Sequence, residues 1–421
     1  MKAPLRVVLI AALLLTATGT APGQGEAALP FLLLPVSPET NGMGGITSSF
    51  ISTHPLAPVS NPAQLGLFSL TNFANAGIFL QETNVSPWLG LAYPLYRAFA
   101  VNAGINLHEY TGLPLGVGIG YSRIHMDLGE FIVTNPSGPQ EIGRVHEYEV
   151  ADNISLAIGI DSGVKIAVGA SIKFINSHLG MMGSESGVAE GPASVTGYDF
   201  GILMKVPIAD LASRAGASLA IPSLHVAPLL DLTLGYSKNN LGDRITYVDP
   251  NQADPLPRTA SLGAGIEAGI VSTLVPDGWK LLSGGLYREA GDILVLRHGP
   301  GGTWEYTGGV GDVDFIDNVI AGKPGSTITQ RKGWQIDVGE FLLFRGGSVH
   351  EPYAEYTTRG FALKLGGLLK ALSAFALEKK GTWADYLMEN LDLRYDWSEY
   401  AAAQHSVAYS SLCVSWKRIP F

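Results

Sequence analysis

Apolar residues alternate one by one with small or polar residues along much of the chain. In the clearest run, 164–174, one face carries Val164, Ile166, Val168, Ala170, Ile172 and Phe174. The other face carries Lys165, Ala167, Gly169, Ser171 and Lys173. The same alternation occurs at 99–108, 115–122, 154–160, 230–236 and 391–398. Because successive side chains of a β-strand point to opposite faces, this period of two predicts strands with one apolar face.

The alternation and the composition together predict a transmembrane barrel. Hydrophobic residues make up 46% of the chain and charged residues 15%, and the mean hydropathy is +0.21. Soluble domains carry about 25% charged residues. No apolar run reaches about 18 residues, which excludes a helical membrane protein. We therefore expect an all-β fold, a transmembrane antiparallel β-barrel in the bacterial outer membrane, whose lipid-facing and lumen-facing residues alternate.

A soluble β-sandwich or propeller would also show alternation, but two features argue against it. The predicted strands run to about 9–13 residues, which suits a tilted strand crossing a bilayer. Aromatic residues gather near strand ends, as in an interfacial girdle, at Tyr93, Tyr96, Tyr110, Trp279, Tyr287, Trp334 and Tyr353. The sequence ends on a further aromatic residue, Phe421.

The first 27 residues have the pattern of a secretory signal peptide. Lys2 and Arg6 supply a positive start, and Val7 to Leu15 is an uncharged apolar run. Small residues follow up to Ala27, as around a cleavage site. The apolar run is too short to span a bilayer. A buried N-terminal helix is the alternative, and removal of residues 1–27 on export is favoured.

Charged residues on the predicted strands must face the barrel interior, because each would cost about 2–4 kcal/mol in mid-bilayer lipid. The expected interior charges are Lys165, Lys173, Asp231, Glu267, Asp337, Glu340, Lys364, Asp392, Arg394 and Asp396. They could pair with one another, for example Arg394 with Asp337 or Glu340. The 52 glycines allow two interpretations. They could let the interior fill, or they could leave an open channel.

Three stretches interrupt the alternation and are expected to be long outer loops. They are Pro136 to Glu149, Met181 to Ser194 and Gly299 to Arg331. Barrels carry long loops on the outer side, where these could contact partners. Pro207 to Ala220 is expected to contain a short helix.

Reactive or ligand-binding motifs are scarce, and we expect neither an enzyme nor a cofactor or metal site. The sequence has no nucleophile elbow and no P-loop. Asp312, Asp314 and Asp317 lack EF-hand spacing and are expected to form a solvated acidic loop. The single cysteine, Cys413, excludes an intramolecular disulfide, and the net charge of −10 makes duplex nucleic acid an improbable partner.

Short motifs recur in a fixed order along the chain. They include a Gly-Met-Gly-Gly segment at 42–45, an Asn-Pro-Ala-x-Leu segment at 61–65, Asn-Leu-Gly at 240–242, Leu-Pro-Arg at 256–258, the hairpin 339–347 and the strand 391–400. In this order they resemble the PorV/PorQ-like outer-membrane proteins. They resemble FadL-type transporters of hydrophobic compounds more loosely.

The resemblance implies a barrel of about fourteen strands, residues 71–421, with residues 28–70 folded inside it as a plug. The motif residues of this plug are Gly42, Met43, Gly44, Gly45, Asn61, Pro62 and Ala63. The glycines permit unusual turns, Asn61 can bond to backbone groups, and Pro62 fixes its own φ angle. A plain packing role is favoured over a gate, because none of these residues is reactive.

Two functions from different classes follow from the resemblance. Proteins similar to PorV work with the type IX secretion system, collecting cargo and passing it to a surface-attachment complex. This implies a non-enzymatic binding or assembly component whose outer loops contact secretion or cargo proteins. The alternative is FadL-like transport of a hydrophobic small molecule. An apolar pocket beside the plug would support transport, whereas a lumen filled by charge pairs would count against it.

Overall fold

The computed structural model describes residues 27–86, 94–134, 138–182, 188–217, 220–247, 253–274, 278–294, 296–298, 304–306, 308–352, 354–375, 386, 390–402 and 405–419. The predicted signal peptide therefore lies outside the described residues except for Ala27. Tyr93, Tyr353 and Phe421 of the predicted aromatic positions also lie outside them.

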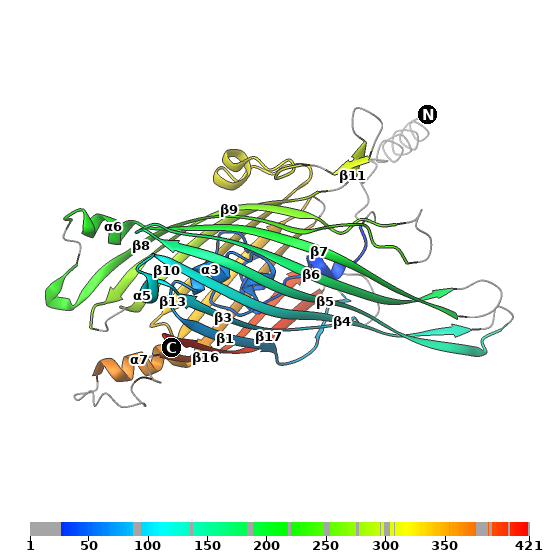
Figure 1. Ribbon diagram of the computed structural model, residues 1–421, viewed down its shortest axis with the longest axis horizontal. Coiled ribbons are helices and arrows are strands. Elements are labelled where there is room, and N and C mark those ends of the chain that lie inside the picture. Colours follow the sequence, from blue (N-terminus) through cyan, green and yellow to red (C-terminus); the bar gives the residue numbers. More distant parts are fainter. Residues whose placement is uncertain are drawn as a thin grey trace, which may run out of the picture.

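Fourteen long antiparallel strands form a closed barrel within the described part of the chain (Figure 1). They are β1 (Phe73–Phe79), β3 (Leu95–Asn106), β4 (Leu115–Thr134), β5 (Glu141–Asp161), β6 (Lys165–Met182), β7 (Val188–Pro207), β8 (Val226–Gly242), β9 (Thr259–Ser272), β10 (Trp279–Ile293), β13 (Ile328–Val338), β14 (Leu342–His350), β15 (Glu355–Lys364), β16 (Leu391–Ala402) and β17 (His405–Lys417). Phe73 pairs with Lys417 on one side and with Gly104 on the other, which closes the ring. This confirms the predicted fold class.

The two ends of the barrel differ. At one end, here called the terminal rim, the barrel starts at Phe73 and ends at Lys417. At the other, the hairpin end, β4 to β7 extend well beyond their neighbours (Figure 1). The connection from β10 to β13 also lies there, and it contains β11 (Leu296–His298), β12 (Trp304–Tyr306) and the π-helix η6 (Phe315–Ile320).

Two of the three predicted loops are wrong. Most of 136–149 belongs to β5, which begins at Glu141, and most of 181–194 belongs to β6 and β7. The arms stay paired out to Thr134 with Glu141 and to Met182 with Val188. Beyond the membrane both faces of a hairpin meet water, so its strands need no apolar alternation.

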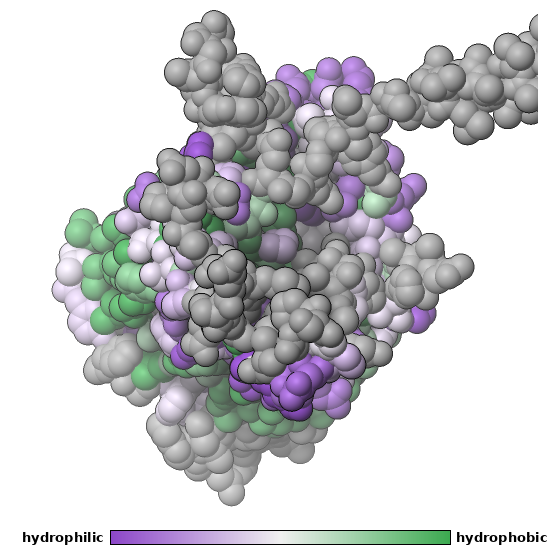
Figure 2. Space-filling view, turned by 90° about the vertical axis from the view of Figure 1, so that its right-hand side faces the viewer, coloured by the Kyte–Doolittle hydropathy of each residue, from purple (hydrophilic) through white to green (hydrophobic). Residues whose placement is uncertain are grey.

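The outer face of the wall is apolar. On β5, for example, the outward side chains of Ile154, Leu156, Ile158 and Ile160 are all exposed. In the view onto the hairpin end, hydrophobic residues lie mainly along the left side and the lower edge, and hydrophilic ones lie at the top, the right and the lower centre (Figure 2). A closed barrel with an apolar outer face is the form in which outer-membrane proteins cross their bilayer. The protein is therefore a bacterial outer-membrane barrel.

The predicted aromatic girdle is only partly correct. Trp334 and Tyr110 are exposed, but Tyr96 and Tyr287 are buried inside the barrel. Both tyrosines occupy inward positions of their strands, and both pack against residues of the N-terminal segment. Position near a strand end thus does not fix which face an aromatic side chain takes.

Short helices complete the structure. The N-terminal segment contains η2 (Pro30–Leu33), α2 (Pro38–Asn41), η3 (Ala57–Val59) and α3 (Gln64–Phe68), and it lies inside the barrel (Figure 1). At the terminal rim are α5 (His108–Thr111), α6 (Ile208–Arg214), η4 (Pro222–Leu224) and α7 (Leu365–Phe375). The helix α6 falls within the stretch predicted to contain one. Among the described residues, no helix is both long and apolar enough to cross a membrane.

Candidate functional site: the plugged lumen

The residues from Leu29 to Ser69, here called the plug, lie against the inner wall, and most of them are buried. The wall that faces the plug is lined with glycines. A Cβ atom on Gly235 would lie 1.7 Å from the carbonyl oxygen of Ser48, and one on Gly201 would lie 1.9 Å from Oδ1 of Asn61. Such close approaches are open only to glycine. The sequence left open whether the glycines let the interior fill or leave an open channel. In the structure they let the plug fill the interior.

Ten of the inward glycines, from nine strands, share this role. They are Gly116, Gly118, Gly159, Gly169, Gly201, Gly235, Gly263, Gly333, Gly347 and Gly360, here called the glycine seat. At each of them, a Cβ atom would come within 3.4 Å of an atom of the plug. At eight of the ten, a plug backbone atom lies this close, so the two backbones touch with no side chain between them; at Gly201 and Gly263 the near plug atoms belong to side chains.

The Gly-Met-Gly-Gly motif makes a tight turn against β13, β14 and β15. Gly44 and Gly45 have positive φ angles of 70° and 72°. The amide of Gly44 donates a hydrogen bond to Oγ1 of Thr358 over 2.8 Å. Gly42 packs on Gly360, and Met43 is buried beside Tyr287. Residues 42–45 of the predicted plug motif therefore form the turn with which the plug packs against the wall.

The Asn-Pro-Ala motif stabilises a second turn of the plug. Asn61 donates through Nδ2 to the carbonyl oxygen of Ser48 over 3.2 Å. Its Oδ1 accepts from the amide of Ala63 over 3.1 Å. Pro62 lies against Gly169, and Ala63 is fully buried against Leu203. Asn61 thus ties two parts of the plug to each other.

A buried ion cluster joins the plug to the wall, and sequence reasoning missed two of its four members. Ser37 caps α2 by accepting the amide hydrogen of Thr40, which holds the helix that carries Glu39. The Glu39 carboxylate lies 2.9 Å from Nη2 of Arg345 and 2.5 Å from Nη2 of Arg394. Asp396 accepts from Arg345 over 2.8 Å and from Arg394 over 2.6 Å. Two carboxylates thus balance two guanidinium groups, and all four are buried.

The cluster differs from the predicted pairing of Arg394 with Asp337 or Glu340. Arg394 instead binds a residue of the plug and its own strand neighbour Asp396. Glu39 lies in the quoted N-terminal motif, and Arg345 lies inward on β14. Because Phe344 faces outward, the alternation of the strand places its neighbour Arg345 inward. This alternation is the signal in the sequence that could have identified Arg345.

His54 of the plug completes this region. Its Nδ1 accepts from the amide of Leu56 over 3.1 Å, so Nε2 carries the proton and lies 2.9 Å from Oγ of Ser411. Burial lowers the pKa of this plug histidine to about 4, so it is neutral at pH 7. His54, Asp396 and Cys413 could together offer three atoms to a metal. The two guanidinium groups already bound at Asp396 disfavour a cation there.

A second buried carboxylate holds the next part of the plug. Glu289 of β10 accepts hydrogen bonds from the amides of Thr47 and Ser48 over 2.8 and 2.7 Å. Arg331 of β13 lies 3.1 Å from the same carboxylate. Apart from its continuation into β1, the plug is therefore fixed to the wall by noncovalent contacts, among them those at Glu39 and Glu289.

The other predicted interior charges form a belt of wall pairs, mainly towards the terminal rim. The pairs are Lys165 with Asp161, Lys205 with Asp231, Lys280 with Glu267 and Asp337, Lys364 with Asp392, and Lys370 with Glu340. Lys173 lies farther along and binds Asp199 over 3.1 Å. These pairs join wall to wall or wall to rim helix, so they hold the barrel rather than the plug.

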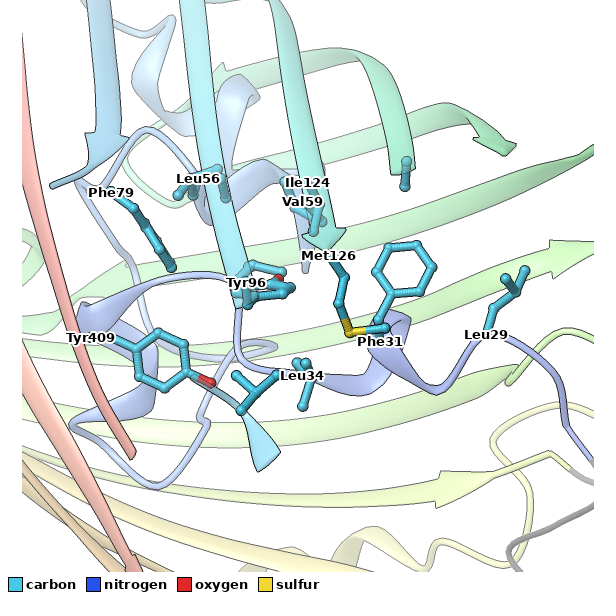
Figure 3. Close-up of a cluster of buried hydrophobic side chains, with 14 of the residues drawn as sticks. Leu29, Phe31, Leu34, Leu56, Val59, Phe79, Tyr96, Ile124, Met126 and Tyr409 are labelled. Atoms are coloured by element: carbon cyan, nitrogen blue, oxygen red, sulfur yellow. The ribbon is translucent and has the colours of Figure 1, made fainter. Parts of the chain in front are cut away.

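Towards the hairpin end the lumen is apolar instead. The first plug residues, Leu29, Phe31 and Leu34, pack among inward side chains of the wall, including Tyr96 and Met126 (Figure 3). This group, here called the lumen cluster, also contains Leu56, Val59, Phe79, Ile124 and Tyr409. Among the described residues, the buried hydroxyl of Tyr96 has no hydrogen-bond partner. An apolar site beside the plug therefore exists, and the plug's own side chains occupy it.

The wall beside the lumen cluster is interrupted. Strand β1 ends at Phe79, and the chain pairs again only in the two-residue strand β2 (Thr83–Asn84). Between them, the amide of Leu80 still donates to the carbonyl oxygen of Ser410 over 3.1 Å. Behind the interruption the rings of Phe79, Tyr96 and Tyr409 meet edge to face, with centroids 5.8–6.4 Å apart. Three aromatic rings of the lumen cluster thus lie behind a stretch of wall that lacks a continuous strand ladder.

Comparison with known proteins gives similarities of fold. No family model matches the chain, and no curated protein matches it. The toluene transporter TbuX of Ralstonia pickettii aligns over 91% of this chain and 97% of its own, with 11% identity and a TM-score of 0.41. The toluene transporter TodX of P. putida aligns over 90% and 97%, with 10% identity and a TM-score of 0.40. A FadL homologue of Pseudomonas aeruginosa aligns over 91% and 98%, with 10% identity and a TM-score of 0.41.

Proposed function

We propose that this outer-membrane barrel carries hydrophobic small molecules across the membrane, with the plug as its gate. The observation that carries the proposal is the lumen cluster. The interior of an outer-membrane barrel is ordinarily polar. Here one end of the lumen is lined by apolar side chains of many strands, which suits an apolar passenger better than water or ions. The proposal assigns no catalytic role and no cofactor to the chain.

The way the plug is held is compatible with movement. Its anchors are ion pairs and hydrogen bonds at Glu39 and Glu289, which can break and reform. Arg394 is paired with the plug rather than with Asp337 or Glu340, so this charge contact can open when the plug moves. The wall-to-wall pairs near the terminal rim do not involve the plug. With the hairpin end outward, a passenger would meet the lumen cluster first and the ion cluster second.

A covalent lock on the plug tests this function. An ideal Cβ on Gly42 lies 3.4 Å from the Cβ of Ser398, close to the roughly 3.8 Å of a disulfide. We would express Gly42→Cys/Ser398→Cys, in a Cys413→Ala background, in a host whose intact outer membrane excludes the apolar dye N-phenylnaphthylamine. The Cys413→Ala protein should increase the rate of dye entry several-fold. The oxidised double variant should not, and a reductant should restore entry.

The controls separate gating from damage. Each single cysteine variant should behave like the Cys413→Ala protein under oxidising conditions, because it cannot form the lock. If the unlocked protein admits no more dye than the empty host, or if the oxidised double variant admits as much as the reduced one, the transport proposal is wrong.

An assembly role, as in the PorV/PorQ-like proteins, is the second candidate. The observation that favours it is the length of β4 to β7, which extend past the other strands at the hairpin end and offer a platform for secretion or cargo proteins. Under this role, removing those projecting arms should abolish partner capture, and the complete protein should admit no more dye than the empty host. Under the transport role alone, the same removal should leave the cell's secreted proteins unchanged.

A further inference from the structure

The helix α7 is fastened to the terminal rim. Its first turn is held by Asp392, whose Oδ1 accepts from the amide of Gly366 over 2.8 Å. Gly367 packs so closely that a Cβ atom there would lie 2.3 Å from the carbonyl carbon of Glu340. One turn later, Nζ of Lys370 lies 2.7 Å from the Glu340 carboxylate. Three separate contacts therefore fix the direction in which the helix leaves the wall.

The side of α7 that faces away from these contacts is apolar. Leu365 and Leu368 are exposed by 42% and 48%, respectively. They border a groove of about 320 Å³ between the helix and the outside of the wall. The wall side of the groove is formed by Phe341, just before β14, by the outward residues Leu363, Leu393 and Leu412 of β15 to β17, and by Arg394 and Tyr395 of β16.

The position of the groove indicates what covers it. Leu363, Leu393 and Leu412 occupy the outward face of their strands, which is the face that meets lipid along the whole barrel. The groove is thus a continuation of the lipid-facing surface, deepened by the helix. Lys364 lines it, with Nζ a loose 3.7 Å from the Asp392 carboxylate, and Lys370 lies one and a half turns along α7.

We propose that this groove binds a phospholipid of the leaflet at the terminal rim. One acyl chain lies between α7 and the wall, and the phosphate lies at the lysine end. A helix with an apolar face and a basic residue on another face suits the plane of a membrane interface, and α7 has this arrangement with Leu365 and Leu368 on one face and Lys370 on another. The groove lies on the outside of the wall, and its proposed role does not rest on the proposed transport.

Native mass spectrometry of protein taken from vesicles of phosphatidylethanolamine and phosphatidylglycerol tests the site. The protein with its own sequence should retain one phospholipid, and Leu368→Asp should lower the retained fraction several-fold. The matched control is Leu224→Asp, which changes a leucine of η4 that is 66% exposed at the same rim but outside the groove. Equal retention by the unchanged protein and Leu368→Asp, or an equal loss in Leu224→Asp, would overturn the proposal.

A second measurement covers the case in which Leu368→Asp fails to fold. Leu368→Cys in a Cys413→Ala background is labelled with bimane and placed in vesicles whose lipids carry a nitroxide on the acyl chain. Contact with a bound chain should at least halve the bimane fluorescence, and a label at Leu224→Cys should be quenched less. A label at 368 that is unquenched, as it would be under a bound protein segment, contradicts the site.

Discussion

At the level of single residues, the plug is held by two kinds of contact. The glycine seat works through shape, because the absence of side chains lets two backbones touch. The ion cluster works through charge, because each buried carboxylate has two guanidinium partners. The glycine seat depends on side-chain volume, and the ion cluster depends on charge. Single substitutions can therefore measure the contribution of each to holding the plug.

Adding one methyl group to the seat should displace the plug. We expect Gly235→Ala to weaken plug seating, because its Cβ would overlap the Ser48 carbonyl oxygen. Overpacking of this kind typically costs about 1–3 kcal/mol. Limited proteolysis of the plug in the folded barrel measures the effect. The matched control is Gly284→Ala, where a Cβ meets nothing within 4 Å. Equal protection of the plug in both variants would contradict the role of the seat.

Neutralising Glu39 should be costly. Glu39→Gln leaves Arg345 and Arg394 with an unbalanced charge in a buried place, and breaking a buried pair costs about 3–5 kcal/mol. We expect a clear fall in the denaturant midpoint for plug release. Glu399→Gln is the control, because Glu399 pairs with the exposed Arg359 and such surface pairs contribute about 0–1 kcal/mol. A similar change in both variants would mean that the ion cluster does not hold the plug.

At the level of elements, the strands were predictable and their ends were not. Alternation identified β4 to β6 because lipid on one side and plug on the other impose opposite demands on successive residues. Past the membrane that contrast ends, so 141–149 and 188–194 carry no such signal although they pair as strands. The short plug helices are set by contacts with the wall, which a local pattern does not contain.

The projecting hairpin of β4 and β5 should be dispensable for the barrel. These strands have 20 and 21 residues, whereas about 9–11 suffice to cross a bilayer. We expect that replacing 130–146 by a two-residue Asn-Gly turn leaves insertion and heat-modifiable migration on gels unchanged. Loss of the folded form in this variant would show that the projecting arms are needed for assembly.

At the level of the whole molecule, barrel and plug form one folded unit. The predicted interior charges lie in the lumen or at its rim, but the sequence could not say which of them meet the plug. Glu39 and Arg345 are 306 residues apart along the chain, and their contact arises only when the barrel closes around the plug. The lumen cluster was equally hidden, because its members come from both the plug and the wall.

Removing the plug should open the barrel. We expect deletion of residues 28–70 to produce a large, steady conductance in planar bilayers, while the complete protein conducts little. Because the deletion could impair folding, Arg345→Gln offers a second route, and it should give brief openings as the plug loosens. A folded, plug-free barrel that stays closed would mean that the wall itself blocks the lumen.

The glycine seat also sets a size limit. Where the wall carries no side chains, a local shift of one plug segment would leave a corridor about as wide as one polypeptide backbone with its nearest substituents. A slender, unbranched molecule could follow such a corridor, whereas a broad or globular one would be turned back. If the barrel transports as proposed, the fit between the plug and the glycine seat therefore sets the width of the passage.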